Sequence, residues 1–375
     1  FLSHQKPYLK VRQFFLHRVY LFRDNINADK YIFAFNGNDY SAVISLTHCK
    51  FGSKGIDLER ESYEGTPITT SRLKAYLYCY YVHMLSIRDC IINYSVTGNN
   101  TDAHGIYCRT ARFLVVEDVK VHAPMNSSSY EYRPLQVTDS SGDANEAVIR
   151  NVEMKVYFNG TYENVPLLFN LNAFQNALVE NIVISMGTGK LGAVRPVNLR
   201  LNSKMIHLYQ LRDFAVRNIT VDLPDLWRLE QNGQIVALSG CYASTYLPGV
   251  VKEVKNIAVT LAHDNGIGSS NTYAEVQNSN RSYFAAVVLD FSSRDTNACW
   301  KVPQVDDVTV IHPRGRALYS CNARLFNVSL QGTAGFNMSL ADVRTIESWF
   351  PGHAVWAGEG STVRIRDLKV NLANP

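Results

Sequence analysis

Val179-Glu180-Asn181-Ile182-Val183-Ile184 carries the pattern that decides the fold of this chain. It reads apolar, any residue, Asn or Asp, apolar, any residue, apolar. The same pattern recurs along the sequence at 87–92, 116–121, 149–154, 216–221, 254–259, 305–310, 325–330 and 365–370. Two earlier copies, centred on Arg18 and His48, keep the apolar positions but lack the Asn or Asp. One short pattern repeated over a whole chain predicts a solenoid, in which each repeat packs against the next.

The Asn or Asp of each copy is expected to form a corner between two strands. The residues that follow it alternate between apolar and variable positions, which is typical of a β-strand. Across it the apolar positions are three apart rather than two, so the strand must bend there. Asn and Asp tolerate the left-handed conformation of a tight bend better than other non-glycine residues. A helix is disfavoured, because the segments are short, β-branched and separated by Gly, Asn and Pro.

The spacing of the corners favours a parallel β-helix over other solenoids. The shortest interval, from Asp307 to Asn327, accommodates three short strands, and the longer intervals indicate insertions. Leucine-rich repeats are the main rival, but their Leu-rich pattern and following helix are absent. We therefore predict an all-β, single-stranded parallel β-helix of about eleven rungs with three strands per rung. The crossover rule for parallel strands favours a right-handed coil.

A further strand is predicted ahead of each corner pattern. Its first and third residues should face the core and its middle residue should face outward. The aligned segments are 33–35, 106–108, 135–137, 167–169, 197–199, 236–238, 318–320 and 355–357.

Composition and charge indicate an ordinary folded protein. The chain has 375 residues, of which 46% are hydrophobic and 19% are charged. Its net charge of +4 is too small to indicate a nucleic-acid partner, and no apolar run is long enough to predict membrane insertion. We expect residues 1–13 to form a lead-in or cap, and 14–375 to form the β-helix domain with a long insertion around 260–300. A chain that begins at Phe1 rather than Met is expected to be a fragment or a processed form.

The seven cysteines are predicted to be core residues rather than metal ligands. Cys49 and Cys90 occupy the pattern position that elsewhere holds Val, Ile or Leu, and Cys108 takes an inward position of the preceding strand. Buried thiols are the usual outcome at such positions. No clustered set of zinc ligands is present, so neither a metal nor a cofactor is predicted.

With its Asn and Asp corners, the chain resembles the right-handed parallel β-helix superfamily. That superfamily includes pectate-lyase-like enzymes, polygalacturonase-type hydrolases and phage tailspike depolymerases. The resemblance covers about Phe14 to Leu372 and rests on the corners, not on a catalytic motif. It implies a polysaccharide-degrading enzyme whose groove is lined by the strand series ahead of the corners. It further implies an extracellular homotrimer, either in a phage virion tail or secreted by a bacterium.

The resemblance places candidate site residues on this strand series. Arg, His, aromatic and amide side chains aligned on one face suit an extended, acidic glycan, since Arg binds carboxylates through paired donors. Asn100-Thr101-Asp102 resembles the Asn-Thr-Asp motif of the hydrolases, although their Asp-Asp, Gly-His-Gly and Arg-Ile-Lys motifs are not found. The candidate catalytic residues are Asp102, His104, Glu131 and Arg133, and the candidate substrate-binding residues are Tyr107, Arg109, Gln136, Arg195, Asn198 and Arg200.

Three functions remain open from the sequence, and the first is cleavage of a polysaccharide, either by hydrolysis or by β-elimination. Asp102 and Glu131 suit an acid/base pair for glycoside hydrolysis. His104, Tyr107, Arg109 and Arg133 supply the base and the carboxylate partner that a polysaccharide lyase needs. A glycan-binding adhesin or structural spike without catalysis would use the same face, because one fold hosts several functions. A sugar transferase or epimerase on this fold is a third interpretation.

Overall fold

The computed structural model describes the strands and several of the turns that join them. The described residues are 12–23, 31–36, 41–53, 75–93, 103–124, 132–137, 145–157, 163–164, 168–186, 199–201, 204–223, 228–229, 233–239, 253–261, 286–291, 303–311, 318–321, 324–333, 364–366 and 369–373. These residues form strands and turns, and they include no helix. None of them belongs to a helix that could cross a membrane. The chain divides into two compact units, at 1–198 and 199–375.

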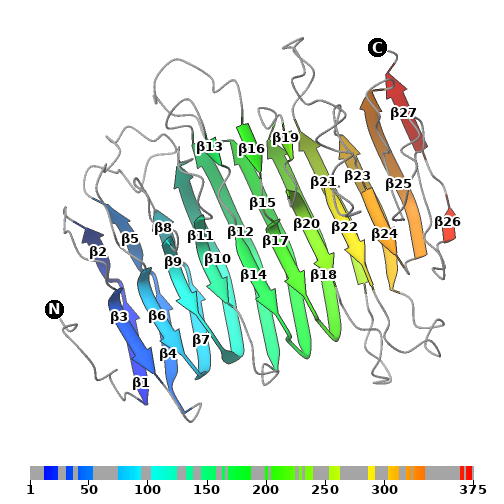
Figure 1. The fold of residues 1–375 in the computed structure, drawn as a ribbon. Helices are drawn as coiled ribbons and strands as arrows, with labels where there is room; N and C mark the ends of the chain where they lie inside the picture. Colours follow the sequence, from blue (N-terminus) through cyan, green and yellow to red (C-terminus); the bar gives the residue numbers. More distant parts are fainter. Residues whose placement is uncertain are drawn as a thin grey trace, which may run out of the picture. The chain divides into compact units, whose positions relative to one another are not determined.

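The first unit contains two sets of parallel strands (Figure 1). One set pairs in the order β1-β4-β7-β10-β12-β15, with the short strands β2, β5 and β8 beside it, and the other in the order β3-β6-β9-β11-β14. The bounds are β1 Gln13–His17, β2 Tyr20–Arg23, β3 Tyr31–Asn36, β4 Val43–Thr47, β5 Lys50–Ser53, β6 Ala75–Tyr80, β7 Val82–Arg88, β8 Ile91–Asn93, β9 Ala103–Cys108, β10 Ala111–Pro124, β11 Tyr132–Val137, β12 Glu146–Tyr157, β13 Glu163–Asn164, β14 Phe169–Asn172 and β15 Asn176–Met186.

The second unit repeats this arrangement. Its strands pair in the orders β18-β21-β23-β25-β26 and β17-β20-β22-β24, while β27 pairs with β25 and β16 pairs with β19. The bounds are β16 Leu199–Leu201, β17 Lys204–Tyr209, β18 Asp213–Leu223, β19 Arg228–Leu229, β20 Gln234–Ser239, β21 Glu253–Leu261, β22 Val287–Asp290, β23 Gln304–Ile311, β24 Leu318–Cys321, β25 Arg324–Thr333, β26 Arg364–Arg366 and β27 Lys369–Ala373. The all-β class with extended parallel sheets is that of a parallel β-solenoid, as the sequence predicts.

The predicted corners are confirmed wherever the structure describes them. The corner residues have φ angles between 49° and 56°, in the left-handed region, and they are Arg18, His48, Asp89, Asp118, Asn151, Asn181, Asn218, Asn256, Asp307 and Asn327. Asp367, the last predicted corner, lies outside the described residues. The corner side chains also bond to one another: Asn151 Nδ2 donates to Asp118 Oδ1 at 2.9 Å, and Asn181 Nδ2 donates to Asn151 Oδ1 at 2.9 Å.

The apolar positions of the pattern form the core, as predicted. In the first unit, Val116 pairs in register with Ile87 on one side and with Ile149 on the other. In the second unit, Val254 pairs in the same way with Val216 and Val305, and all of these side chains are fully buried. Because the same position is apolar in each copy, stacking the copies removes it from water along the length of each sheet.

The strand series ahead of the corners is only partly as predicted. Phe169 pairs with Leu135, so this strand is shifted by two residues, and Leu168, predicted to face outward, is 1% exposed. The partner of β20 is β17 and not the predicted segment 197–199, which instead ends in β16. The aligned segments do not include strands β6 and β22, and β22 lies inside the predicted insertion around 260–300. An apolar run such as 167–169 lacks the alternation that would fix its register.

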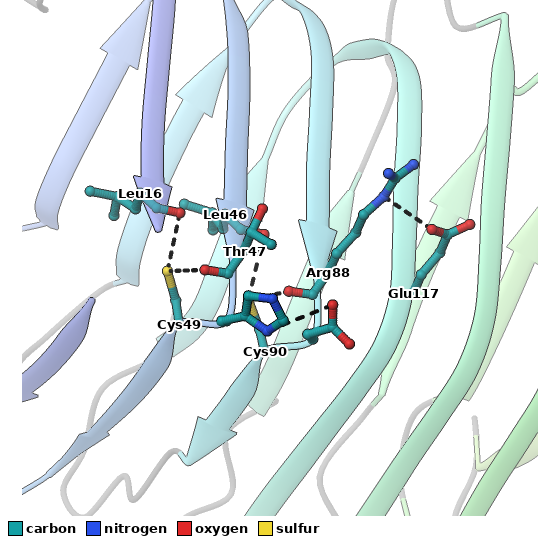
Figure 2. A network of polar contacts seen from close by, with 9 residues as sticks. Leu16, Leu46, Thr47, Cys49, Arg88, Cys90 and Glu117 are labelled. Carbon is teal, nitrogen blue, oxygen red and sulfur yellow. Dashed lines mark hydrogen bonds and ion pairs between the residues drawn. The ribbon is translucent and has the colours of Figure 1, made fainter. Parts of the chain in front are cut away.

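The cysteines predicted to be core residues, Cys49, Cys90 and Cys108, are buried free thiols. Figure 2 shows Cys49 and Cys90 directly after successive corners. Cys90 Sγ lies 3.1 Å from the carbonyl oxygen of Arg88, and Cys49 Sγ lies 3.4 Å from that of Leu16. Burial raises the pKa of Cys90 to about 12, and hydrogen bonds to the backbone of Cys49 and Arg88 act in the opposite direction. The thiol form is therefore retained in the folded protein.

We expect Cys90 to resist modification and to destabilise the fold at alkaline pH. The pKa of Cys90 in the folded protein lies above its value in the unfolded chain, so the protonated thiol contributes to the stability of the fold. This contribution is complete at neutral pH and is lost as the pH rises from about 9 towards 12. Thiol titration with Ellman's reagent should find Cys90 unreactive until urea unfolds the chain. Cys90→Ala should lose less stability than the parent between pH 7 and pH 10. Rapid reaction of Cys90 in the native protein would contradict this prediction.

Candidate functional site

One face of the first unit gathers aromatic, cationic and amide side chains. It is formed by the outward residues of β6, β9, β11 and β14, which alternate with buried residues such as Leu77, Ile106 and Leu135. Register pairing places Tyr78 beside Tyr107, Tyr107 beside Gln136, and Gln136 beside Asn170. We call Tyr78, Tyr80, Tyr107, Arg109, Gln136 and Asn170 the tyrosine–arginine face.

The aromatic part of this face is a stacked array. The rings of Tyr78 and Tyr107 lie 5.0 Å apart with an interplanar angle of 6°, and Tyr80 packs against Tyr78 at 5.0 Å. The stacking follows from the register, since adjacent parallel strands bring equivalent side chains within about 5 Å of each other. Stacked aromatic pairs are favourable, so the array holds these side chains in fixed positions on the face.

Arg109 directly follows β9, the strand next to that of Tyr80, and joins this array. Its Nη1 donates to the Tyr80 hydroxyl oxygen at 2.9 Å, and its guanidinium carbon lies 5.0 Å from the centre of the Tyr80 ring. The hydrogen bond from Tyr78, together with that of Arg109, holds the pKa of Tyr80 below its ordinary value, with burial acting in the opposite direction. The pair therefore combines a fixed cation with a hydroxyl that loses its proton more readily than a free tyrosine.

Two amide oxygens on the face are buried without a hydrogen bond. Within the described part of the chain, Gln136 Oε1 and Asn170 Oδ1 have no hydrogen-bond partner. Gln136 is only 7% exposed, although it occupies an outward position next to Tyr107. A buried acceptor without a hydrogen bond costs free energy, so such atoms are uncommon unless a ligand or a water molecule donates a hydrogen bond to them.

The structure places the predicted substrate-binding residues unevenly. Tyr107, Arg109 and Gln136 come together on the tyrosine–arginine face, and their role in substrate binding stays a prediction. Arg195 and Asn198 lie outside the described residues. Arg200 is on β16, which pairs with β19, so its expected place in the strand series with β20 is wrong.

The predicted catalytic residues are placed only in part. His104 and Arg133 are register partners on β9 and β11, which confirms that these positions are neighbours along the sheet. Asp102 and Glu131 lie outside the described residues, each one position ahead of its strand in sequence. The described residues contain no group of three His, Cys, Asp or Glu side chains that could hold a metal ion.

Sequence reasoning missed Tyr78 and Tyr80. The aligned segments pass from 33–35 to 106–108 and do not include the strand that carries these two residues. The signal was nevertheless present, because Leu77-Tyr78-Cys79 has the same alternation as Ile106-Tyr107-Cys108, and the two segments pair residue by residue.

Comparisons with known protein families, curated proteins and solved structures give no match to this chain.

Proposed function

We propose that this protein binds an extended acidic polysaccharide on the tyrosine–arginine face and cleaves it there. The observation that carries the proposal is the convergence of stacked rings, one guanidinium and unpaired amide oxygens on adjacent strands. Sugar rings pack on aromatic surfaces, uronate carboxylates pair with guanidinium groups, and sugar hydroxyls donate to amide oxygens. Repetition along the strands suits a ligand that is itself a repeating chain.

The architecture supports this proposal. We propose that the parallel solenoid is a right-handed β-helix of about eleven rungs, in which the tyrosine–arginine face runs along one sheet. The protein would then act outside the cell, as a secreted bacterial enzyme or in a phage tailspike, and a homotrimer is part of the same proposal. The Asn and Asp corners and the parallel pairing of the strands support the β-helix. The location outside the cell and the homotrimer rest on the resemblance to the right-handed parallel β-helix superfamily alone.

Tyr80 and Arg109 favour cleavage by β-elimination. In that reaction a base removes the proton from C5 of a uronate, the bond from C4 to the leaving oxygen breaks, and the leaving oxygen takes up a proton. Tyr80 supplies a hydroxyl with a lowered pKa, and Arg109 lies beside it to pair with the carboxylate whose α-proton is removed. His104 and Arg133, on adjacent strands, are proposed as further site residues at the start of the face.

The proposal is tested by incubating the chain with uronate polysaccharides and with a neutral glucan. We expect binding to the uronate chains only, with unsaturated products that absorb at about 232 nm after base abstraction. Tyr80→Phe should retain binding while cleavage falls about 100-fold, the usual scale for losing a general base. Arg109→Gln should weaken binding itself.

Tyr20→Phe serves as the matched control, because Tyr20 is an exposed tyrosine on β2, outside the tyrosine–arginine face. Its binding and cleavage should equal those of the parent. Saturated fragments would overturn the elimination step and turn attention to hydrolysis by Asp102 and Glu131. Binding without any cleavage would leave a glycan-binding spike, and no binding at all would overturn the proposal.

A further inference from the structure

A second cluster of reactive side chains lies in the other unit, on strands β17 and β20. His207 Nε2 lies 3.1 Å from Ser239 Oγ and 3.1 Å from Lys204 Nζ. The strands are paired in register, with His207 beside Ala237 and Tyr209 beside Ser239. All three polar residues of this cluster are half-buried, so Ser239 is not sealed in the core.

The contacts of His207 fix the direction of its hydrogen bonds. A lysine ammonium group has donors only, so Nε2 must be an acceptor in its contact with Lys204. The proton of the ring then resides on Nδ1, and Ser239 must donate its hydroxyl proton to the same Nε2. This is the arrangement of a serine nucleophile with its general base.

The surroundings hold this pair in place. The Tyr209 ring packs against the His207 ring with centres 5.5 Å apart, and Gln210 Nε2 donates to the Tyr209 hydroxyl at 3.1 Å. Ala237, the register partner of His207, and Val288, the next residue across the sheet, are both fully buried. Apolar neighbours lower the local dielectric and strengthen the hydrogen bonds between the polar groups.

We propose that Ser239 and His207 form a nucleophilic site that hydrolyses carboxylic esters, in addition to any action on glycan chains. Ser239 Oγ attacks the ester carbonyl carbon and its proton passes to His207 Nε2. The bond from that carbon to the alkoxy oxygen breaks, and the departing alcohol takes the proton from Nε2. Water then attacks the acyl-serine, which releases the carboxylic acid and restores the Ser239 hydroxyl. Lys204 donates to the same nitrogen in the resting state, so this contact must open as Nε2 takes the proton of Ser239.

The test uses a fluorophosphonate probe on the full chain, followed by mass spectrometry of the labelled peptides. We expect an adduct on Ser239, and Ser239→Ala should abolish it. His207→Gln should slow labelling about 100-fold, because the general base is lost. Hydrolysis of p-nitrophenyl acetate should fall in parallel with labelling in both variants.

The matched control is Ser329→Ala, which removes a half-buried strand serine of the same unit and should leave labelling unchanged. The absence of an adduct on the parent chain would overturn the proposal, and so would an unchanged labelling rate in His207→Gln. This outcome is independent of the glycan experiment, because neither the probe nor the ester requires the tyrosine–arginine face.

Discussion

Asn151→Val is expected to lower the free energy of unfolding by about 2–3 kcal/mol, because it affects both the backbone and the side-chain bonds of a corner. Asn151 has a φ of 56°, and a left-handed residue with a β-carbon costs roughly 1–2 kcal/mol. Valine is branched at the β-carbon and tolerates this region poorly. The variant also loses the hydrogen bonds that join Asn151 to Asp118 and Asn181, each of which contributes about 0.5 kcal/mol in this exposed setting.

Two variants separate these effects. Asn151→Gly keeps the left-handed conformation but loses the side-chain bonds, so the difference between the Gly and Val variants reports the backbone strain. Asn176→Val is the matched control, since Asn176 is an exposed asparagine in β15 without a positive φ. Urea unfolding followed by circular dichroism measures all three. Equal stability of the Val and Gly variants would show that the corner conformation is not what Asn151 supplies.

The corners could be predicted from the sequence because a left-handed backbone conformation restricts which residue types can occupy the position. A left-handed residue between two strands favours Asn and Asp, and the flanking apolar residues mark its position. A second set of left-handed residues was missed, namely Tyr81, Ala173 and Gln210, at the ends of β6, β14 and β17. Nothing in Tyr, Ala or Gln indicates a positive φ, so the local sequence carries no signal there. The surrounding strands impose the conformation instead.

The candidate site could be predicted in part for the same reason. The alternation of apolar and polar residues along each strand places Tyr107 and Gln136 on the outward side. The pairing of strands from successive repeats places Arg109 near them. The contact between Arg109 and Tyr80 joins residues 29 positions apart, and β6 had not been recognised as part of the series. The serine–histidine pair was missed because 197–199 was assigned the place in the sheet that β17 occupies. Errors in strand register therefore displace whole sets of outward side chains.

Ion pairs also follow the register, in the column just before the corners. Glu117 accepts from Arg88 at 3.0 Å and from Arg150 at 2.8 Å, and Figure 2 shows the first of these contacts beside the cysteines. The Glu117 side chain is 12% exposed, whereas both arginines are about half-exposed. The alternation of charge from strand to strand favours the native order of the strands, because leaving out one strand would place like charges together. The solenoid is thus specified by its polar surface as well as by its core.

Gln136→Met is expected to raise stability while it removes glycan binding. The buried Gln136 Oε1 lacks a hydrogen bond within the described residues, and an unsatisfied buried acceptor costs about 1–3 kcal/mol. Methionine has a similar length and buries no such acceptor, so the free energy of unfolding should rise by about 1 kcal/mol or more. The same substitution deletes the oxygen proposed to accept from a sugar hydroxyl, so affinity for the uronate polysaccharide should fall about tenfold.

Opposite changes in stability and binding are the signature of a residue retained for a ligand, because function is often maintained at a cost in stability. Gln13→Met is the matched control, since Gln13 is an exposed glutamine on β1 and both quantities should stay unchanged. Urea unfolding and affinity electrophoresis in polysaccharide-containing gels measure the two effects on the same preparations. A Gln136→Met variant that is less stable and binds normally would show that Gln136 supports the sheet, and it would remove the amide oxygen from the proposed site.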